Sequence, residues 1–344
     1  MRAARIGIVH TQTPLRISFL GGGTDFPGYF NIDGGCVLGT SVAFYSYVVV
    51  NSLPAVGSDR IKVSYSRLEQ VVEPSQLKHE ITRFVLERHP ASWRDHFVDI
   101  HSYADLPAGA GLGSSSAYTV GFLHAIHSLM GSYRSPAELA REAISVERTG
   151  LGHAGGWQDQ VLTAVGGLNR VEFNADSFQV VPVVLPPDRL AALESACVLY
   201  YGQRSGASAS IQEKIMTQDS IAARRSLLDR LRDLASLGER TLRSACDNRT
   251  MVAEFGALLD EGWNLKRRMA SSISTEQIDV LYESAMKAGA FGGKLCGAGG
   301  GGAMLFLVPE ERRREVDRAL VGMTPMDLRF ERLGSRVIFG DYRS

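Results

Sequence analysis

The chain has no excess of charge of either sign. Its 344 residues contain 37 Lys and Arg against 37 Asp and Glu, so the formal net charge at pH 7 is zero. Proteins that coat nucleic acid take most of their affinity from a basic surface, and we therefore expect no nucleic-acid partner. A local basic pocket for a small anion is compatible with this balance.

Cysteine is scarce and unpaired in the sequence. The four cysteines, Cys36, Cys197, Cys246 and Cys296, are far apart and form no Cys-x-x-Cys pair. This spacing argues against a zinc ribbon or a thioredoxin-like site. It predicts free, buried thiols in a reducing compartment.

Long apolar runs are also missing. No apolar stretch approaches the roughly 18 residues needed to span a bilayer. The first 20 residues include Arg2, Arg5 and Arg16 without a continuous apolar core, unlike a secretory signal. We therefore expect a cytoplasmic protein without a membrane partner, while the sequence leaves its oligomeric state open.

Glycine, by contrast, is abundant. The 36 glycines are about one residue in ten, against about 7% in average proteins. Many of them lie in clusters at 21–23, 109–113, 150–156 and 297–302. Clustered glycines allow the backbone to approach a ligand closely.

The patterning of the chain predicts an α+β protein with two domains. Two prolines after an apolar run, Pro186 and Pro187, indicate a boundary, so we expect domains at 1–188 and 189–344. Ser135, Pro136 and Glu138 form a predicted capping box for a helix that runs to about Glu147. Strands are predicted at 13–20, 36–50, 61–65, 97–103, 197–201 and 303–308, and further helices at 115–130, 208–245 and 250–271.

The segment from Pro107 to Ala117 opens a predicted helix with alternating glycines and three serines. Unpaired N–H groups and the positive end of the helix dipole favour a polyphosphate there. The alternative is a glycine-serine turn that only caps the helix. The segment fits neither a Walker A loop, which needs Gly-Lys-Ser/Thr, nor the Gly-x-Gly-x-x-Gly dinucleotide fingerprint.

Two carboxylates flank the next glycine-rich loop. Glu147 and Asp159 could divide the work of phosphoryl transfer, one binding Mg²⁺ and one beside the attacking hydroxyl. The alternative is a solvated helix end and a helix cap. Arg16 lies in an apolar strand, where an unpaired charge is costly, and so needs an anionic partner. Asp25 follows three glycines and is a candidate for binding sugar hydroxyls.

In this order and spacing, the segments resemble the three motifs of the GHMP kinases. The motifs match Thr13 to Asp25, Pro107 to Ala117 and Lys294 to Ala303, and thus span nearly the whole chain. The resemblance implies a two-domain fold with the active site in the cleft between the domains. It also implies ATP and Mg²⁺ as cofactors.

The resemblance assigns roles to individual residues. Asp159 is expected to be the catalytic carboxylate, with Arg16 beside it, and Ser115 and Glu147 are expected to bind Mg²⁺. The expected ATP-binding residues are Pro107, Gly109, Ala110, Gly111, Leu112, Gly113, Ser114, Ser115 and Ser116. The expected substrate-binding residues are Gly22, Gly23, Thr24, Asp25, Gly156, Gly299 and Gly300.

The first motif suggests the acceptor. Galactokinases have Gly-Glu-His-Thr-Asp where this chain has three glycines before Thr24 and Asp25. The motif resembles the branch with D-glycero-D-manno-heptose 7-phosphate kinases, which implies phosphorylation of an anomeric hydroxyl to give a 1,7-bisphosphate. Open alternatives are a kinase of another sugar or cyclitol, fucose-like or mannose-like, and a non-catalytic sensor of sugar and ATP. Glycine spacing disfavours a dinucleotide-dependent oxidoreductase.

Several other side chains are weaker candidates. A substrate phosphate would need donors, for which Arg204, Ser205, Arg148 and Arg170 are available. Trp157 and His153 either line the acceptor pocket or, for Trp157, serve packing alone. His124 and His127 are interpreted as residues of a helix face, because the sequence offers no third metal ligand.

Overall fold

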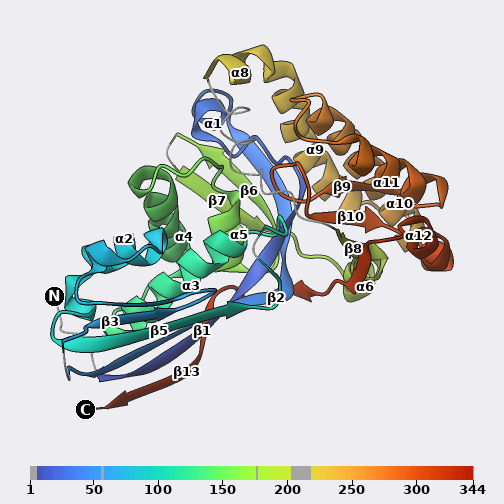
Figure 1. Cartoon of the computed structure of the whole chain (residues 1–344). Coiled ribbons are helices and arrows are strands. Elements are labelled where there is room, and N and C mark those ends of the chain that lie inside the picture. Colours follow the sequence, from blue (N-terminus) through green and yellow to red (C-terminus); the bar gives the residue numbers. More distant parts are fainter. Residues whose placement is uncertain (1–5, 56–57, 108, 176, 203–217, 344) are drawn as a thin grey trace.

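Two β-sheets with packed helices organise the chain (Figure 1). The structure is a computed structural model that describes residues 6–55, 58–107, 109–175, 177–202 and 218–343. The mixture of helices and largely antiparallel sheets confirms the predicted α+β class.

The first sheet has nine strands among the described residues, in the order β13-β1-β2-β5-β3-β4, with β6 and β12 also paired to β2 and β7 paired to β6. The long strands β1 and β2 form its centre and pair along almost their whole length. Its strands are β1 (Ile6–Leu20), β2 (Gly35–Pro54), β3 (Ile61–Ser64), β4 (Leu68–Val71), β5 (His96–Ala104), β6 (Leu168–Asn174), β7 (Ser177–Pro182), β12 (Phe330–Glu331) and β13 (Arg336–Arg343).

Helices α3 and α5 pack against β1 and β2. The predicted capping box is confirmed, because Ser135 Oγ accepts from Glu138 N while the Glu138 carboxylate accepts from Ser135 N. Helix α4 then passes into a π-helical turn, Ser145–Gly150, which contains the buried Glu147. The helices are α1 (Pro27–Asp33), α2 (Glu80–Arg88), α3 (Ser114–Leu129), α4 (Pro136–Ile144) and α5 (Gln158–Val165), with 3-10 turns at Pro74–Gln76 and Pro90–Ser92.

The second sheet has the order β11-β8-β10-β9. Its strands are β8 (Cys197–Tyr201), β9 (Gly292–Leu295), β10 (Ala303–Leu307) and β11 (Thr324–Asp327). Its helices are α6 (Pro187–Ala196), α8 (Gln218–Ala223), α9 (Arg225–Leu242), α10 (Asn248–Arg267), α11 (Glu276–Lys287) and α12 (Arg313–Ala319), with a 3-10 turn at Glu310–Arg312. The first part of the helix predicted at 208–245 lies outside the described residues.

One apolar core joins the two halves. It contains β1 residues such as Leu15 and Ile17 together with buried residues of α9 and α10. The ring of Phe19 on β1 lies 5.5 Å from that of Phe255 on α10, in an edge-to-face arrangement. The end of β1 is therefore fixed between both halves, where the site described below is built.

Strands β12 and β13 return to the first sheet, which the sequence did not predict. Strand β13 pairs with β1, and β12 pairs with β2. Local patterning cannot show pairing between segments this far apart in sequence. The domain limits 1–188 and 189–344 remain a prediction, and any such division has to allow for these late strands in the N-terminal sheet.

The cysteines are free, as predicted. Cys36, Cys197 and Cys296 are buried, whereas Cys246 is only partly buried. Among the described residues, no helix combines the length and the apolar character needed to cross a bilayer.

Candidate functional site

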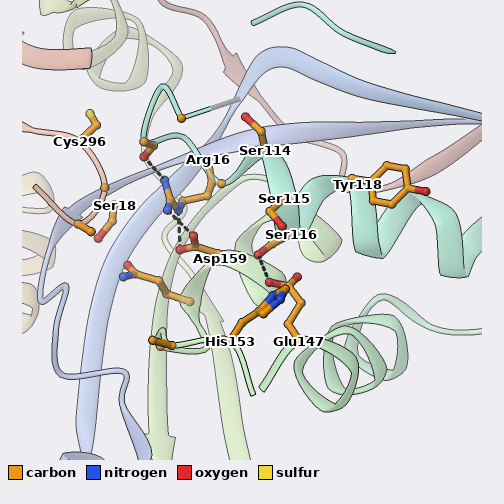
Figure 2. Close-up of a pocket in the computed structure, with 18 of the residues that line it drawn as sticks. Arg16, Ser18, Ser114, Ser115, Ser116, Tyr118, Glu147, His153, Asp159 and Cys296 are labelled. Carbon is orange, nitrogen blue, oxygen red and sulfur yellow. Dashed lines mark hydrogen bonds and ion pairs between the residues drawn. The ribbon is translucent and has the colours of Figure 1, made fainter. Parts of the chain in front are cut away.

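A cleft of about 990 Å³ is lined by residues from both halves of the chain. The first half contributes the loop before α3, the start of α5 and the end of β1. The second half contributes the end of α10, the loop after it and the C-terminal glycine stretch. Figure 2 shows Arg16 and Asp159 at the middle of this cleft.

The loop before α3 ends in a helix N-terminus that faces the cleft. Gly109, Gly111 and Gly113 have φ values of 88°, 81° and 77°, in the left-handed region that favours glycine. These left-handed glycines bend the chain so that it enters helix α3 at Ser114. The Ser114 hydroxyl oxygen is buried without a hydrogen-bond partner. A helix N-terminus of this kind has free N–H groups and binds anions.

The expected ATP-binding residues of this segment fall into two groups. Pro107, the three glycines and all three serines line the cleft. Ala110 and Leu112 are fully buried in the apolar core instead. These two residues therefore hold the loop in place and can offer a ligand only their backbone.

The two glycine stretches touch each other. A Cβ at Gly111 would lie 2.5 Å from the Cys296 carbonyl oxygen, and one at Gly297 would lie 2.7 Å from the Gly111 Cα. Side chains at either position would force the loops apart. The contact brings a loop from each half of the chain to the same end of the cleft.

Arg16 and Asp159 form a bidentate pair, so the predicted proximity of these two residues is confirmed. Arg16 Nε and Nη2 donate to the two carboxylate oxygens of Asp159 at 2.8 and 2.5 Å. Arg16 Nη1 donates to the Gly111 carbonyl at 2.7 Å and so ties the pair to the loop before α3. Burial alone would lower the pKa of Arg16, but the charge of Asp159 and its hydrogen bonds raise it. The guanidinium therefore stays charged.

Glu147 is a buried carboxylate with one free oxygen. Its Oε2 accepts a hydrogen bond from Ser116 Oγ at 3.2 Å, whereas Oε1 has no partner. Burial raises the pKa of Glu147, because the charged form is poorly solvated there. Ser115 lies on the cleft wall in the first turn of α3. This set of oxygen donors fits a hard divalent cation such as Mg²⁺.

The expected substrate-binding residues also divide. Gly22, Gly23, Gly156 and Gly299 line the cleft, whereas Thr24, Asp25 and Gly300 are not part of its wall. The Gly300 N–H donates to the Ile273 carbonyl.

Asp25 is fully buried and is not part of the cleft wall. Its oxygens accept from the N–H groups of Gly23 and Gln158, both at 3.1 Å. Thr24 donates to the carbonyls of Gly21 and Cys36. Both side chains thus fix the shape of the glycine loop, and contact of Asp25 with a substrate stays a prediction. Burial raises the pKa of Asp25.

Sequence reasoning missed several groups that line the cleft. Lys266 and Lys294 bring positive charge from the second half, and Ser18 and Gln158 bring buried polar atoms without partners. Lys294 is the first residue of the third motif, three positions before the glycine cluster at 297–302, and this was its only signal. Lys266 lies in an ordinary helical pattern. The wall also includes Tyr65, His79, Ile81, Ser102, Tyr103 and Leu106.

The weaker candidates have different places. His153 lines the cleft, whereas Trp157 packs its ring edge-on to Phe30 at 4.7 Å. Arg148 lines the cleft and donates to the Gly156 carbonyl at 3.0 Å. Arg170 is paired with Glu172 and Glu239. Arg204 and Ser205 lie outside the described residues.

His127 belongs to a polar cluster at the far end of α3. Glu142 accepts from His127 at 2.6 Å and from His89 at 3.0 Å, one histidine on each carboxylate oxygen. These three side chains are close enough to share a metal ion. Both carboxylate oxygens are already hydrogen-bonded, however, and we interpret the cluster as a clamp that joins α3, α4 and the end of α2. His124 contacts Ser335 instead.

Comparison with known proteins agrees with the geometry. Residues 78–167 match the GHMP kinases N terminal domain, and residues 242–322 match the GHMP kinases C terminal domain. The chain is 28% identical over 342 residues to a D-glycero-alpha-D-manno-heptose 7-phosphate kinase from Campylobacter jejuni, covering 91% of this chain and 93% of that protein. It is 26% identical to a bifunctional fucokinase/GDP-fucose pyrophosphorylase from Arabidopsis thaliana, covering 92% of this chain but 32% of that protein.

A solved structure extends the likeness to the whole fold. A D-glycero-D-manno-heptose 1-phosphate kinase from Bacteroides thetaiotaomicron superimposes with a TM-score of 0.75 at 27% identity, covering 98% of this chain and 99% of that one. The two family models match one segment in each half of the chain, and both halves line the cleft. The protein belongs to the GHMP kinase family and is a small-molecule kinase of that family.

Proposed function

We propose that the protein transfers the γ-phosphoryl group of ATP to the anomeric hydroxyl of D-glycero-D-manno-heptose 7-phosphate. The hydroxyl oxygen forms a bond to the γ-phosphorus, the bond from that phosphorus to the β–γ bridging oxygen breaks, and ADP leaves. The hydroxyl proton passes to Asp159. The products are the heptose 1,7-bisphosphate and ADP.

The observation that carries this proposal is the position of the Arg16–Asp159 pair. Arg16 holds both oxygens of Asp159 and, through Nη1, the carbonyl of Gly111. One guanidinium thus links the carboxylate to the loop that precedes the anion-binding end of α3. In phosphoryl transfer the protein mainly positions groups and neutralises charge, which such a link does.

The other residues take supporting roles in the proposal. The loop from Pro107 to Ser116 binds the ATP phosphates through its backbone N–H groups and serine hydroxyls. Glu147 and Ser115 hold Mg²⁺, for which the unpartnered oxygen of Glu147 is the structural support. When bound, the ion offsets negative charge on the phosphates. Gly22, Gly23, Gly156 and Gly299 leave room for the acceptor.

The choice of acceptor rests on the relatives. The Campylobacter and Bacteroides proteins are named for heptose phosphates, and both cover nearly the whole chain. The Arabidopsis relative is named for fucose, which keeps an unphosphorylated sugar as the competing acceptor.

Phosphorus NMR of the purified protein tests the proposal. The protein is incubated with Mg-ATP and, separately, D-glycero-D-manno-heptose 7-phosphate, mannose, fucose, galactose or a cyclitol. We expect a new anomeric phosphate signal from the heptose phosphate, lost in Asp159→Asn. Turnover of only an unphosphorylated acceptor would overturn the heptose assignment. ATP binding without turnover of any acceptor would favour a sensor.

A further inference from the structure

Two lysines of the second half line the cleft on one side of the Arg16–Asp159 pair. Lys294 lies on β9 and is 9% exposed, and Lys266 lies at the end of α10. Lys294 Nζ donates to the carbonyls of Ser18 and Phe19 at 2.7 and 3.0 Å. Lys266 Nζ donates to the carbonyl of Gly297. No described carboxylate lies within 4 Å of either ammonium group.

Neither lysine has an anionic hydrogen-bond partner among the described residues, so the positive charge of the protonated forms is offset only at a distance. Asp159 is already paired with Arg16. The negative charge of Asp25 favours the charged form of both lysines, but it does so without a hydrogen bond to either. Burial lowers the pKa of Lys266 to about 8 and, together with the positive charge of Lys266, that of Lys294 to about 7. A buried cation without an anionic partner is costly, and an arriving anion would remove that cost.

The position of Lys294 favours the acceptor over the nucleotide. In Figure 2, Ser18 and Cys296 lie on one side of the Arg16–Asp159 pair, whereas Ser115, Ser116 and Glu147 lie on the other. Lys294 contacts the backbone of Ser18, at the end of β1 that leads into the loop at 21–23. Lys294 therefore lies on the side of Ser18, away from the proposed magnesium ligands, whereas Lys266 contacts Gly297, which packs against Gly111 of the loop before α3.

The same side offers groups for hydroxyls. The Ser18 hydroxyl and the Gln158 carbonyl oxygen are buried without partners. Both flank Gly22, where an added Cβ would lie 3.3 Å from Ser18 Oγ and 3.6 Å from Gln158 Nε2. A polyol that also has an anionic group would satisfy these atoms and the lysines together.

We propose that Lys266 and Lys294 form a subsite for a phosphate that the acceptor already contains, so that the enzyme selects sugar phosphates over free sugars. Ser18 and Gln158 bind hydroxyls of the same acceptor. This inference rests on the proposed kinase function.

Binding of inorganic phosphate tests the subsite without turnover. Calorimetry is done with saturating Mg²⁺ and β,γ-imido-ATP, so that the nucleotide phosphates are already in place. We expect phosphate to bind the wild type and to compete with the acceptor. Lys266→Met and Lys294→Met should each weaken binding at least tenfold, and the Arg variants should restore part of it. Lys287→Met, on the exposed face of α11, is the matched control.

Kinetics gives the second readout. The ratio of kcat/KM for heptose 7-phosphate to that for the unphosphorylated heptose should exceed about 100 in the wild type and fall at least tenfold in each Met variant. A higher KM for ATP at an unchanged ratio would assign the lysines to the nucleotide and overturn the inference. So would a wild type that binds no phosphate.

Two further outcomes are separable. If the Met variants fail to fold, as judged by circular dichroism, competition of phosphate with the acceptor in the wild type decides the question alone. If heptose 7-phosphate is not phosphorylated but another sugar phosphate is, the heptose assignment fails while the subsite stands.

Discussion

Removing one partner of the Arg16–Asp159 pair should cost more stability than removing both. The perturbation is a cycle of three variants, Asp159→Asn, Arg16→Met and the double variant. Arg16 is 7% exposed and Asp159 23% exposed, so each charge is largely removed from water. Loss of one partner leaves the other charge uncompensated, whereas loss of both leaves no charge.

The magnitude follows from burial and from the number of hydrogen bonds. Removing one partner of a buried ion pair costs about 3–5 kcal/mol of stability. Because Asp159 is partly exposed, we expect Arg16→Met to cost about 2–3 kcal/mol. Asp159→Asn keeps one acceptor for Arg16 and should cost about the same. The double variant should lose no more than the worse single variant, which gives a coupling energy of about 2 kcal/mol.

Urea unfolding of the four proteins measures the cycle, and initial rates measure catalysis. We expect kcat to fall about 10²- to 10⁴-fold in Asp159→Asn, the usual range for loss of a general base. Additivity of the two stability losses within about 0.5 kcal/mol would refute the reasoning about the pair. A kcat within threefold of the wild type would refute the catalytic role proposed for Asp159.

Three more predictions concern the rest of the cleft and the cluster behind it. Glu147→Gln should raise the Mg²⁺ concentration for half-maximal rate at least about tenfold, or roughly 1.4 kcal/mol, and an unchanged magnesium titration would contradict the proposed ligand. Gly156→Ala places a Cβ 1.9 Å from Asp25 Oδ2 and should raise the acceptor KM about tenfold, with little change in the KM for ATP. Burial raises the pKa of Glu142, but hydrogen bonds from two histidines outweigh it and lower this pKa to about 2. The lowered pKa stabilises the folded protein at pH values above 4.5, the usual pKa of a glutamate. The free energy of unfolding should fall by about 1–2 kcal/mol, after allowance for solvent screening, as the pH drops towards 2. Urea unfolding should show a fall that is larger by this amount in the wild type than in Glu142→Gln, because other carboxylates with lowered pKa values, such as Glu69 and Glu331, remain in both proteins.

The sequence predicted those parts of the site that depend on local conformation. The alternating glycines before Ser114 need left-handed backbone, and the capping box at Ser135 is a short-range hydrogen-bond pattern. The charge on Arg16 within an apolar strand required a partner, and Asp159 is that partner. Each of these predictions depends either on a pattern of a few neighbouring residues or on the energetic cost of burying one charge.

The parts that were not predicted depend on contacts between distant segments. Lys266 and Lys294 have no distinctive local pattern, and only the fold brings α10 and β9 to the wall of the cleft. Asp25 is buried and accepts hydrogen bonds from Gly23 and Gln158, which no spacing reveals, and its contact with a substrate stays a prediction. Spacing alone shows which residues can meet along one element, and it cannot show which atoms a fold leaves without a partner.

The pairing of β13 with β1 has a consequence for synthesis of the chain. Residues 6–12 of β1 pair with a strand made roughly 330 residues later, which takes the ribosome about 20 to 60 s at ordinary rates. Until then the open edge of β1 exposes unpaired backbone groups, a known starting point for aggregation. We therefore expect the need for chaperones during translation to depend more on the delay before β13 is synthesised than on the size of the protein.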